Sequence, residues 1–490
     1  MTETTPLKLF NSLTRQTEEF RPVHPGEARV YSCGPTVYNY PHIGNMRAYV
    51  FADTLGRALS FKGYKLTHVI NITDVGHLTD DADAGEDKME KMAAEKAQSI
   101  WDIAEHYKQA YWADVKALNI RQPAQWTIAT DFVPQMIEFA KGIADKHCYA
   151  LPGGLYFDTS TVADYGRLAR AVTEEGAKGI GARIEEVEGK RHAADFAIWR
   201  NTPTGETRQM EWESPWGRGA PGWHLECSVM SGEVLGFPFD IHTGGIDHRE
   251  IHHPNEIAQN QAHNCTNGLD MAENSGARIW MHNNFLVERS GKMSKSSGEF
   301  LRVQLLIDKG FHPLAYRMMC LQAHYRSELE FSWEILAAAL TRLKRMVMAV
   351  APLTGLAAAP AIRNPKLTEL LERFDAAISD DLNTAVALTL LDEAVAIKKV
   401  PTEEKRALIE AMDAVLGFDL LTLTRTDLRV RPKDAALEDE AVEELLATRK
   451  AARAAQDFAA SDAIRDQLVA AGIDVMDGDP LRWDWKPILG

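Results

Sequence analysis

Two short segments, far apart in the chain, combine residue types that suit the binding of a nucleotide's phosphates. His42-Ile43-Gly44-Asn45 brings together an imidazole, an amide and a glycine that lets the backbone approach a ligand closely. Lys292-Met293-Ser294-Lys295-Ser296 holds two ammonium groups in a turn between glycines. Lysines over a pyrophosphate act mainly on charge that develops in the transition state, so they raise the rate more than the affinity. The residues predicted at this ATP site are His42, Lys292 and Lys295 in catalysis and Gly44, Asn45 and Met293 in binding.

The pattern around the first segment predicts the β-α-β unit that positions it. Residues 28–33 read as a buried strand, residues 45–61 as a helix with one apolar face, and residues 66–72 as a second, parallel strand. A parallel sheet binds nucleotides where a strand ends and a helix begins, because unpaired N–H groups and the helix dipole favour phosphate there. An alternative is that Asn45 only caps the helix and His42 only lies in the preceding loop.

A further strand at 239–242 runs into a glycine-rich turn that is predicted to complete the nucleotide site. Gly244 and Gly245 leave room for a ligand, and the Asp247 carboxylate can accept hydrogen bonds from ribose hydroxyls. We therefore predict that Gly244, Gly245 and Asp247 also contact ATP.

The two phosphate-binding segments resemble the two signatures of the class I aminoacyl-tRNA synthetases. Within that class the chain is similar to the cysteinyl-tRNA synthetase family over nearly its whole length. The motifs that carry the resemblance are Tyr31-Ser-Cys-Gly-Pro-Thr-Val-Tyr38, Asn71-Ile-Thr-Asp74, Gly222-Trp-His-Leu-Glu-Cys227, Asp240-Ile-His-Thr-Gly-Gly-Ile-Asp247, His252-His-Pro-Asn-Glu256 and Asp381-Leu-Asn-Thr384. The chain departs from the family at Asn45, where a second histidine is common. An amide can still donate to phosphate, but it cannot act there as an acid or a cation.

The resemblance implies one zinc ion per chain, in the amino-acid pocket. By motif position its ligands are Cys33, Cys227, His252 and Glu256. Thiolate, imidazole and carboxylate are the ligand types that zinc takes. The neighbouring His253 is an alternative to His252, because the proline that follows it favours an extended conformation and a simple helical face is then not expected.

The resemblance also implies the reaction and its partners. L-cysteine would attack the α-phosphate of ATP, bound with Mg²⁺, and the cysteinyl group would then pass to tRNA(Cys). Thr73 and Trp223 would line the cysteine pocket. This chemistry needs no protein nucleophile, so position and charge are expected to supply the catalysis.

Length and pattern predict several domains in series, because 490 residues exceed what one hydrophobic core holds. The expected fold is α/β, a Rossmann-like parallel-sheet catalytic core with an insertion, followed by an α-helical C-terminal tRNA-binding region. An acidic segment at 76–96 is predicted to be a solvated surface insertion. The predicted divisions are 1–115 and 219–287 for the two halves of the catalytic domain, 116–218 for the insertion, 288–340 for the signature loop and stem contact, 341–424 for a helical bundle and 425–490 for anticodon binding.

The C-terminal region is predicted to contact RNA only through a local basic face. The net charge of −16 makes general attraction to nucleic acid unfavourable. Residues 443–471 read as one long helix, on which Arg449 and Arg453 share a face. Trp483 and Trp485 are predicted to offer surfaces on which unpaired bases stack.

Composition predicts a cytoplasmic protein, and the family resemblance leaves two alternative functions. We expect neither a targeting segment nor a membrane span, and the five scattered cysteines argue against a disulfide framework. One alternative is a related ligase that joins cysteine to an amino sugar in mycothiol synthesis, which lacks the tRNA-binding tail. The other is an inactive relative that only binds RNA, which the departure at Asn45 suggests.

Overall fold

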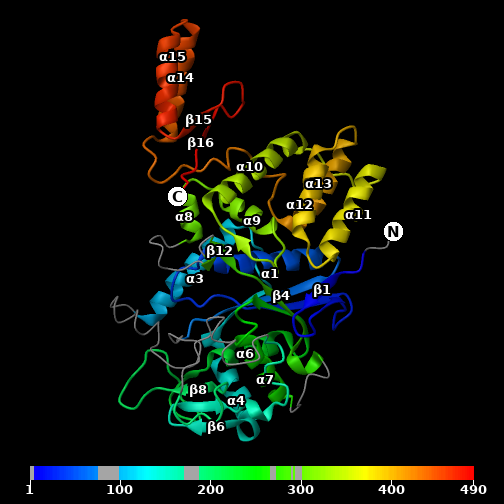
Figure 1. The fold of residues 1–490 in the computed structure, drawn as a ribbon, viewed down its shortest axis with the longest axis vertical. Coiled ribbons are helices and arrows are strands. Elements are labelled where there is room, and N and C mark those ends of the chain that lie inside the picture. Colours follow the sequence, from blue (N-terminus) through cyan, green and yellow to red (C-terminus); the bar gives the residue numbers. More distant parts are fainter. Residues whose placement is uncertain are drawn as a thin grey trace.

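A parallel sheet of five strands forms the centre of the protein in our computed structural model (Figure 1), which describes residues 5–75, 99–169, 187–264, 272–288, 291–292 and 301–489. The strand order is β11-β10-β3-β4-β5, and every neighbouring pair is parallel. The strands are β3 (Glu27–Ser32), β4 (Lys65–Ile72), β5 (Gln125–Ile128), β10 (Phe239–Gly245) and β11 (Ala277–Asn283). The strand order reverses between β3 and β10, so the crevice expected of such sheets lies at their carboxyl ends. The predicted Rossmann-like core is therefore confirmed.

The predicted β-α-β unit is present, with α1 (Ile43–Phe61) between β3 and β4. The helix buries Met46, Val50 and Leu55 against the core and ends before Gly63, whose φ of 89° suits a residue without a side chain. β5 follows α3 (Ile100–Ala117) and pairs with β4. The boundary expected at residue 116 therefore falls before β5, which is an edge strand of the main sheet. The acidic segment at 76–96 lies outside the described residues.

A separate antiparallel sheet occupies one end of the molecule, at the bottom of Figure 1. Its strands, in order of pairing, are β6 (Cys148–Leu151), β7 (Gly154–Phe157), β8 (Phe196–Asn201) and β9 (Gly219–Pro221). The helix α4 (Val133–His147) packs beside it, and the chain returns to the main sheet through α6 (Trp223–Leu235) and, after β10, α7 (His252–His263). This sheet lies between β5 and β10 in the chain, where the sequence predicted an insertion, and β9 lies just beyond the expected end at residue 218.

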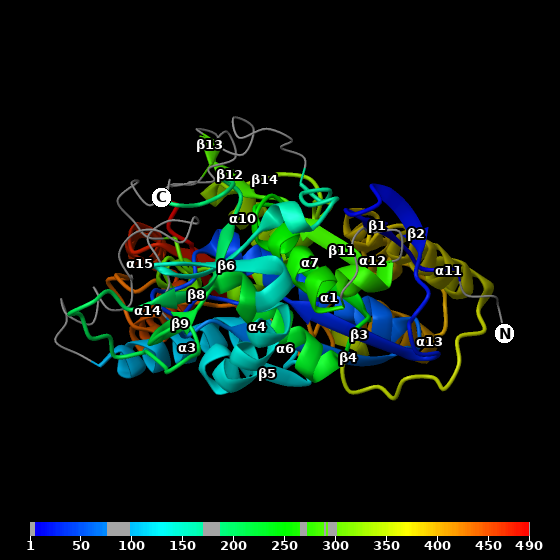
Figure 2. The same ribbon diagram turned by 90° about the horizontal axis from the view of Figure 1, so that it is seen from below.

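A small sheet of three strands, which lie together in Figure 2, links the core to the helical half. In it β12 (Leu286–Glu288) pairs with both β13 (Gly291–Lys292) and β14 (Leu329–Glu330). Two helices, α8 (Val303–Asp308) and α9 (Pro313–Leu321), lie between β13 and β14 in the chain. A hairpin of β1 (Lys8–Asn11) and β2 (Gln16–Glu19) packs against β11.

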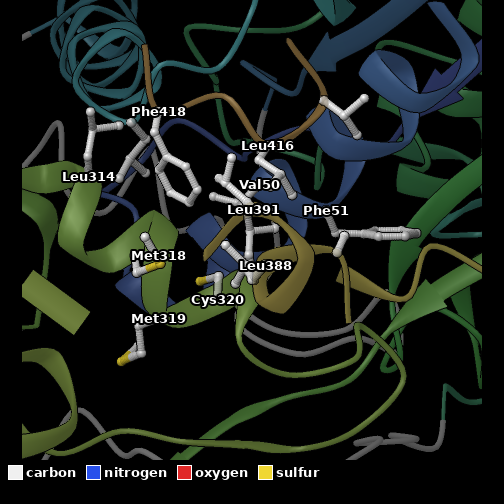
Figure 3. Close-up of a cluster of buried hydrophobic side chains, with 14 of the residues drawn as sticks. Val50, Phe51, Leu314, Met318, Met319, Cys320, Leu388, Leu391, Leu416 and Phe418 are labelled. Atoms are coloured by element: carbon white, nitrogen blue, oxygen red, sulfur yellow. The ribbon is translucent and has the colours of Figure 1, made fainter. Parts of the chain in front are cut away.

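Four helices form the bundle that follows, and its core is continuous with α1 (Figure 3). They are α10 (Trp333–Val350), α11 (Pro365–Ser379), α12 (Thr384–Ala396) and α13 (Thr402–Leu416). The apolar side chains that meet there include Val50 and Phe51 of α1, Met318 of α9, and Leu388 and Leu391 of α12. The catalytic core and the bundle therefore share one hydrophobic interior.

A buried ion pair reinforces this junction. Asp53 of α1 accepts hydrogen bonds from Arg57 and Arg317, each at 2.7 Å, and all three side chains are almost fully buried. Arg317 also donates to the carbonyls of Leu416 at 2.7 Å and Leu118 at 3.1 Å. Asp53 and Arg317 thus connect α1 with α9 and α13.

The C-terminal region is a helical hairpin with a two-stranded sheet at its base, and it projects at the top of Figure 1. It contains α14 (Asp439–Ala454), α15 (Phe458–Ala470), β15 (Ile473–Val475) and β16 (Trp483–Trp485). The prediction of one long helix over 443–471 is wrong. Gln456 has a φ of 59°, and the Asp457 side chain caps the new helix by accepting from Ala460 N at 3.0 Å.

Candidate functional site

A cleft of about 460 Å³ opens at the carboxyl ends of β3 and β10, where the sheet topology places the crevice. The sequence-predicted residues that line it are Cys33, His42, Gly44, Asn45, Trp223, Gly245 and Asp247. Asn284, Phe285 and Leu286 form another part of its wall. The first signature, the glycine-rich turn and one predicted metal ligand therefore meet at one cleft, although the glycine-rich turn lies far from the other two in sequence.

The amino end of α1 faces this cleft, and His42 rather than Asn45 caps it. His42 Nδ1 accepts a hydrogen bond from Gly44 N at 3.1 Å, so a neutral ring carries its proton on Nε2. The alternative of Asn45 as the cap is therefore wrong. Asn45 is exposed at the cleft, where its amide can donate to an anion beside the positive end of the helix dipole.

A buried group of metal-ligand side chains lies beneath the cleft. The ligand atoms of Cys33, Cys227, His252 and Glu256 all lie within 4.8 Å of one another. Cys33 directly follows β3, Cys227 lies on α6, and the other two residues lie on the first turns of α7. The four predicted ligands are thus brought together from three elements.

The expectation that the histidine and glutamate would not share a simple helical face is wrong. α7 begins at His252, Pro254 sits in its first turn, and His252 Nε2 lies 3.0 Å from Glu256 Oε1 at the i, i+4 spacing. Glu256 Oε1 accepts no hydrogen bond of good geometry from the described residues. A buried carboxylate oxygen without such a donor suits a cation, so the residues fit a bound metal ion.

A second group of the same kind overlaps the first and keeps His253 as an alternative. It consists of Cys33, His242, His253 and Glu256. His253 Nε2 lies 3.3 Å from Cys33 Sγ, while its Nδ1 lies 2.7 Å from His282 Nε2. His242 Nε2 lies 2.8 Å from the second oxygen of Glu256. Both groups share the same thiol and carboxylate.

The electrostatics of the first group favour a divalent cation. A hydrogen bond from Cys33, together with the nearby His252, lowers the pKa of Cys227 to about 6 against the effect of burial. Burial raises the pKa of Cys33 well above its ordinary value. Burial opposes the charge of His252, but Glu256 and Cys227 raise its pKa to about 10. The lowered pKa of Cys227 favours its thiolate, and a metal ion can replace the imidazole proton between that thiolate and the Glu256 carboxylate.

Of the two residues predicted for the cysteine pocket, Trp223 lines the cleft and Thr73 is buried. The Trp223 ring stacks on His252 with centroids 4.3 Å apart. The Thr73 hydroxyl donates to Glu226 Oε2 at 2.9 Å while accepting from Asn71 Nδ2 at 3.2 Å. Glu226, beside the metal-ligand group, was missed as a site residue, although it precedes Cys227 in a quoted motif.

Histidines around the metal-ligand group were also missed. His224 Nδ1 lies 2.9 Å from His252 Nδ1, and His242 and His282 hold the contacts described above. The available signal was the unusual density of histidine between residues 224 and 282. Such outer hydrogen bonds fix the ring orientation of metal-binding side chains.

The glycine-rich turn packs tightly against two histidine rings. Gly244 and Gly245 belong to β10, so the strand extends further than its predicted end at 242. A Cβ added at Gly244 would lie 2.7 Å from His253 Cε1 and 2.8 Å from His248 Nδ1. Gly244 is therefore required by the imidazoles beside the metal-ligand group, while Asp247 is exposed at the cleft.

The second signature is only partly described. Lys292 lies on β13, whose backbone pairs with β12 at Val287. Met293 and Lys295 lie outside the described residues.

The predicted RNA-contacting residues of the C-terminal region fall into two groups. Arg449 is buried and forms a bidentate ion pair with Asp477 at 2.6 and 2.8 Å, whereas half of the Arg453 side chain is exposed. Trp483 and Trp485 are 0% and 2% exposed and form the core of this region. The prediction that these tryptophans stack on bases is therefore wrong, because alternate residues of β16 point into the hydrophobic interior.

Comparisons with known proteins agree with this arrangement. Residues 19–341 match the model of a family described as tRNA synthetases class I (C) catalytic domain, and residues 437–480 match the cysteinyl-tRNA ligase anticodon binding domain. A cysteine–tRNA ligase of Novosphingobium aromaticivorans is 76% identical over 98% of this chain and 97% of its own length. One from Zymomonas mobilis is 53% identical over 98% of both chains.

A solved structure supports the fold, and a separate result concerns helices that could span a membrane. The methionyl-tRNA synthetase of Mycobacterium tuberculosis in complex with methionyl-adenylate aligns with a TM-score of 0.52 and 14% identity, covering 80% of this chain and 89% of that one. Within the part of the chain that the structure describes, every helix is too short or too polar to span a bilayer.

Proposed function

Because the chain belongs to the class I aminoacyl-tRNA synthetases, in the family of the cysteine–tRNA ligases, we propose that it activates L-cysteine with ATP and transfers the cysteinyl group to tRNA(Cys). The observation that carries the proposal is the buried Cys/His/Glu group beneath a cleft that opens at the amino end of α1. A metal ion bound there would recognise the substrate's thiol beside a helix end suited to phosphate, as cysteinyl-adenylate formation requires. We place the reaction in the cytoplasm, with the other components of protein synthesis.

The nucleotide is held by position and charge in this proposal. His42 Nε2–H and the Asn45 amide donate to the phosphates at the helix end, with Mg²⁺ accompanying ATP. Asp247 accepts from ribose hydroxyls, and Gly244 and Gly245 keep that wall of the cleft open. Lys292 and Lys295 stabilise the leaving pyrophosphate, and Met293 lies beside the nucleotide.

The amino acid is held at the floor of the cleft. Cys33, Cys227, His252 and Glu256 would hold a zinc ion, which when bound ligates the substrate's thiolate and so distinguishes cysteine from serine. We favour His252 over His253 because it lies beside both Cys227 and the Glu256 oxygen that lacks a good donor. Trp223 shapes one wall, and Thr73 orients the amino acid through its hydrogen bonds with Glu226 and Asn71.

The tRNA would extend from the cleft to the α14–α15 hairpin. Arg453 is the better candidate for a phosphate contact because half of its side chain is exposed, and Arg449 shapes the same surface through Asp477. The anticodon-binding match at 437–480 does not favour a mycothiol-type ligase, which lacks such a region.

Exchange of labelled pyrophosphate into ATP tests the proposed activation step. The exchange should require cysteine and should not be supported by serine or methionine. Purified protein with bound metal that gives no cysteine-dependent exchange, yet still binds tRNA(Cys), would instead favour the inactive RNA-binding relative.

A further inference from the structure

One buried guanidinium joins two parts of the cleft wall and has no role in the reaction described above. Arg47 of α1 is 2% exposed and donates to four backbone carbonyls. Its Nη1 donates to Asn284 O at 2.8 Å and Phe285 O at 2.5 Å, and its Nη2 donates to His324 O at 3.3 Å and Ser327 O at 2.6 Å. In every hydrogen bond that the structure describes for this side chain, the acceptor is therefore a backbone carbonyl oxygen in one of two loops.

These loops are the starts of two strands of the small sheet. Asn284 and Phe285 immediately precede β12, and Ser327 lies shortly before β14. The loops also bond to each other, with Asn284 N donating to Tyr325 O at 2.8 Å. Because β12 pairs with both β14 and β13, Arg47 anchors to α1 the sheet whose third strand carries Lys292.

The anchored segment is itself part of the cleft wall. Gly44, Asn45 and Ala48 of α1 line the cleft together with Asn284 and Phe285. Arg47 lies in the same turn of the helix and holds these two parts of the lining together from behind. Its position therefore bears on the spacing between the amino end of α1 and the neighbouring loop.

An arginine is a costly way to achieve packing alone. Burial lowers the pKa of Arg47, and apolar groups of similar volume are often as stabilising as buried charges. The planar guanidinium, however, supplies several N–H donors in a fixed fork, which can hold separate carbonyls in one plane. Lysine offers only a compact ammonium at the end of a flexible chain, so it cannot reproduce that geometry.

We propose that Arg47 is a positioning residue for cysteine activation, which fixes the 284–285 loop and the strand carrying Lys292 at the distance from α1 that ATP requires. This inference rests on the proposed function. It concerns the nucleotide half of the site, so it predicts a defect towards ATP and not towards cysteine.

The test is Arg47→Lys, measured by pyrophosphate exchange with ATP and cysteine varied separately. We expect kcat/KM for ATP to fall about 10²-fold, as a misplacement of about 1 Å can cause, while KM for cysteine stays near that of the wild type. Arg57→Lys is the matched control. Arg57 is a second buried arginine of α1, and it also donates to carbonyls, those of Ala414 at 3.1 Å and Asn119 at 2.8 Å, but it lies away from the cleft.

The outcomes separate the possible explanations. An ATP defect in R47K that is absent from R57K at equal thermal stability supports the proposal. Three results would overturn it: normal ATP kinetics in R47K, equal defects in R47K and R57K, or a KM for cysteine that changes as much as the KM for ATP. If R47K does not fold, Arg47→Gln, which keeps two N–H donors, replaces it under the same criteria. Wild-type protein without cysteine-dependent exchange would contradict the proposed function, whereas calorimetric titration of ATP into wild type and variant would still test the positioning of the nucleotide.

Discussion

A methyl group added at Gly244 should damage cysteine activation by displacing the imidazoles beside the metal-ligand group. The new Cβ would lie 2.7 Å from His253 Cε1 and 2.8 Å from His248 Nδ1, where ordinary contact begins at 3.4 Å. The His253 ring, the His248 ring or the Gly244 backbone must therefore shift by at least a few tenths of an ångström. The His253 ring lies 3.3 Å from Cys33 Sγ and 2.7 Å from His282, so its displacement disturbs the metal-ligand group.

The size of the effect follows from this displacement. Overpacking a buried site typically costs about 1–3 kcal/mol of folding free energy. A shift of nearly 1 Å in an active site can lower the rate about 10²-fold. Gly244→Ala should therefore remain folded, with reduced stability, and lose about 10²-fold in cysteine-dependent pyrophosphate exchange.

Gly142→Ala provides the control for the glycine-to-alanine change itself. Gly142 lies in α4, and a Cβ there meets no atom within 4 Å. This variant should keep full activity and gain about 0.5–1 kcal/mol in stability, because alanine is the better helix former. Denaturant unfolding and exchange kinetics would be measured on both variants. A Gly244→Ala enzyme as active as the wild type would refute the argument that the imidazoles need this space.

Four further predictions concern the tail, the signature loop, the buried ion pair and the metal. Truncation after Asp434 should spare activation but lower tRNA charging about tenfold or more, since each 1.4 kcal/mol of lost RNA contact is tenfold; equal charging by both forms would contradict it. Lys295→Ala should reduce pyrophosphate exchange by about 10²–10³ with little change in KM for cysteine, and unchanged exchange would remove this lysine from the reaction. Asp53→Asn should destabilise the fold by about 3–5 kcal/mol in denaturant unfolding because it leaves Arg317 buried without a counter-charge, and a loss below about 1 kcal/mol would argue against the ion pair. Burial of Asp53 raises the pKa of its carboxyl, but Arg317 and Arg57 lower that pKa more strongly, so the net shift is downward. The stability that this ionised carboxyl adds to the fold is therefore complete above the unfolded pKa of about 3.9, and it should be lost as pH falls through the pKa of the folded state. Cys227→Ser should lower the metal content and the discrimination against serine together, and retention of both would exclude the thiol as a ligand.

The sequence predicts the core of the site because local pattern and topology agree there. The apolar face of residues 45–61 and the flanking strands predict the β-α-β unit, and the first signature necessarily falls at its crevice. The metal ligands could be named only through the family resemblance. Cys33 follows β3 and Glu256 lies on the helix after β10, so the two residues meet because these strands are neighbours in the sheet. The spacing of apolar residues within one segment does not predict which strands are neighbours.

The failures have equally specific causes. The run from 443 to 471 contains neither proline nor glycine, so propensity alone predicts one helix, while the break depends on a single residue with positive φ and a capping aspartate. The alternation in Trp483-Asp484-Trp485 is a strand pattern that would have predicted both rings on one buried face. The role of Arg47 was not predictable, because its acceptors are main-chain oxygens more than two hundred residues away.

The central claim is that a metal ion held by the buried Cys/His/Glu group recognises the thiol of the substrate. Metal analysis followed by cobalt substitution tests it most directly, because sulfur-to-cobalt absorption reports each thiolate ligand. One metal ion per chain should bind, and cysteine but not serine should change the sulfur-to-cobalt absorption of the substituted protein. Metal-free protein that still activates cysteine normally, or a cobalt spectrum indifferent to cysteine, would contradict the account.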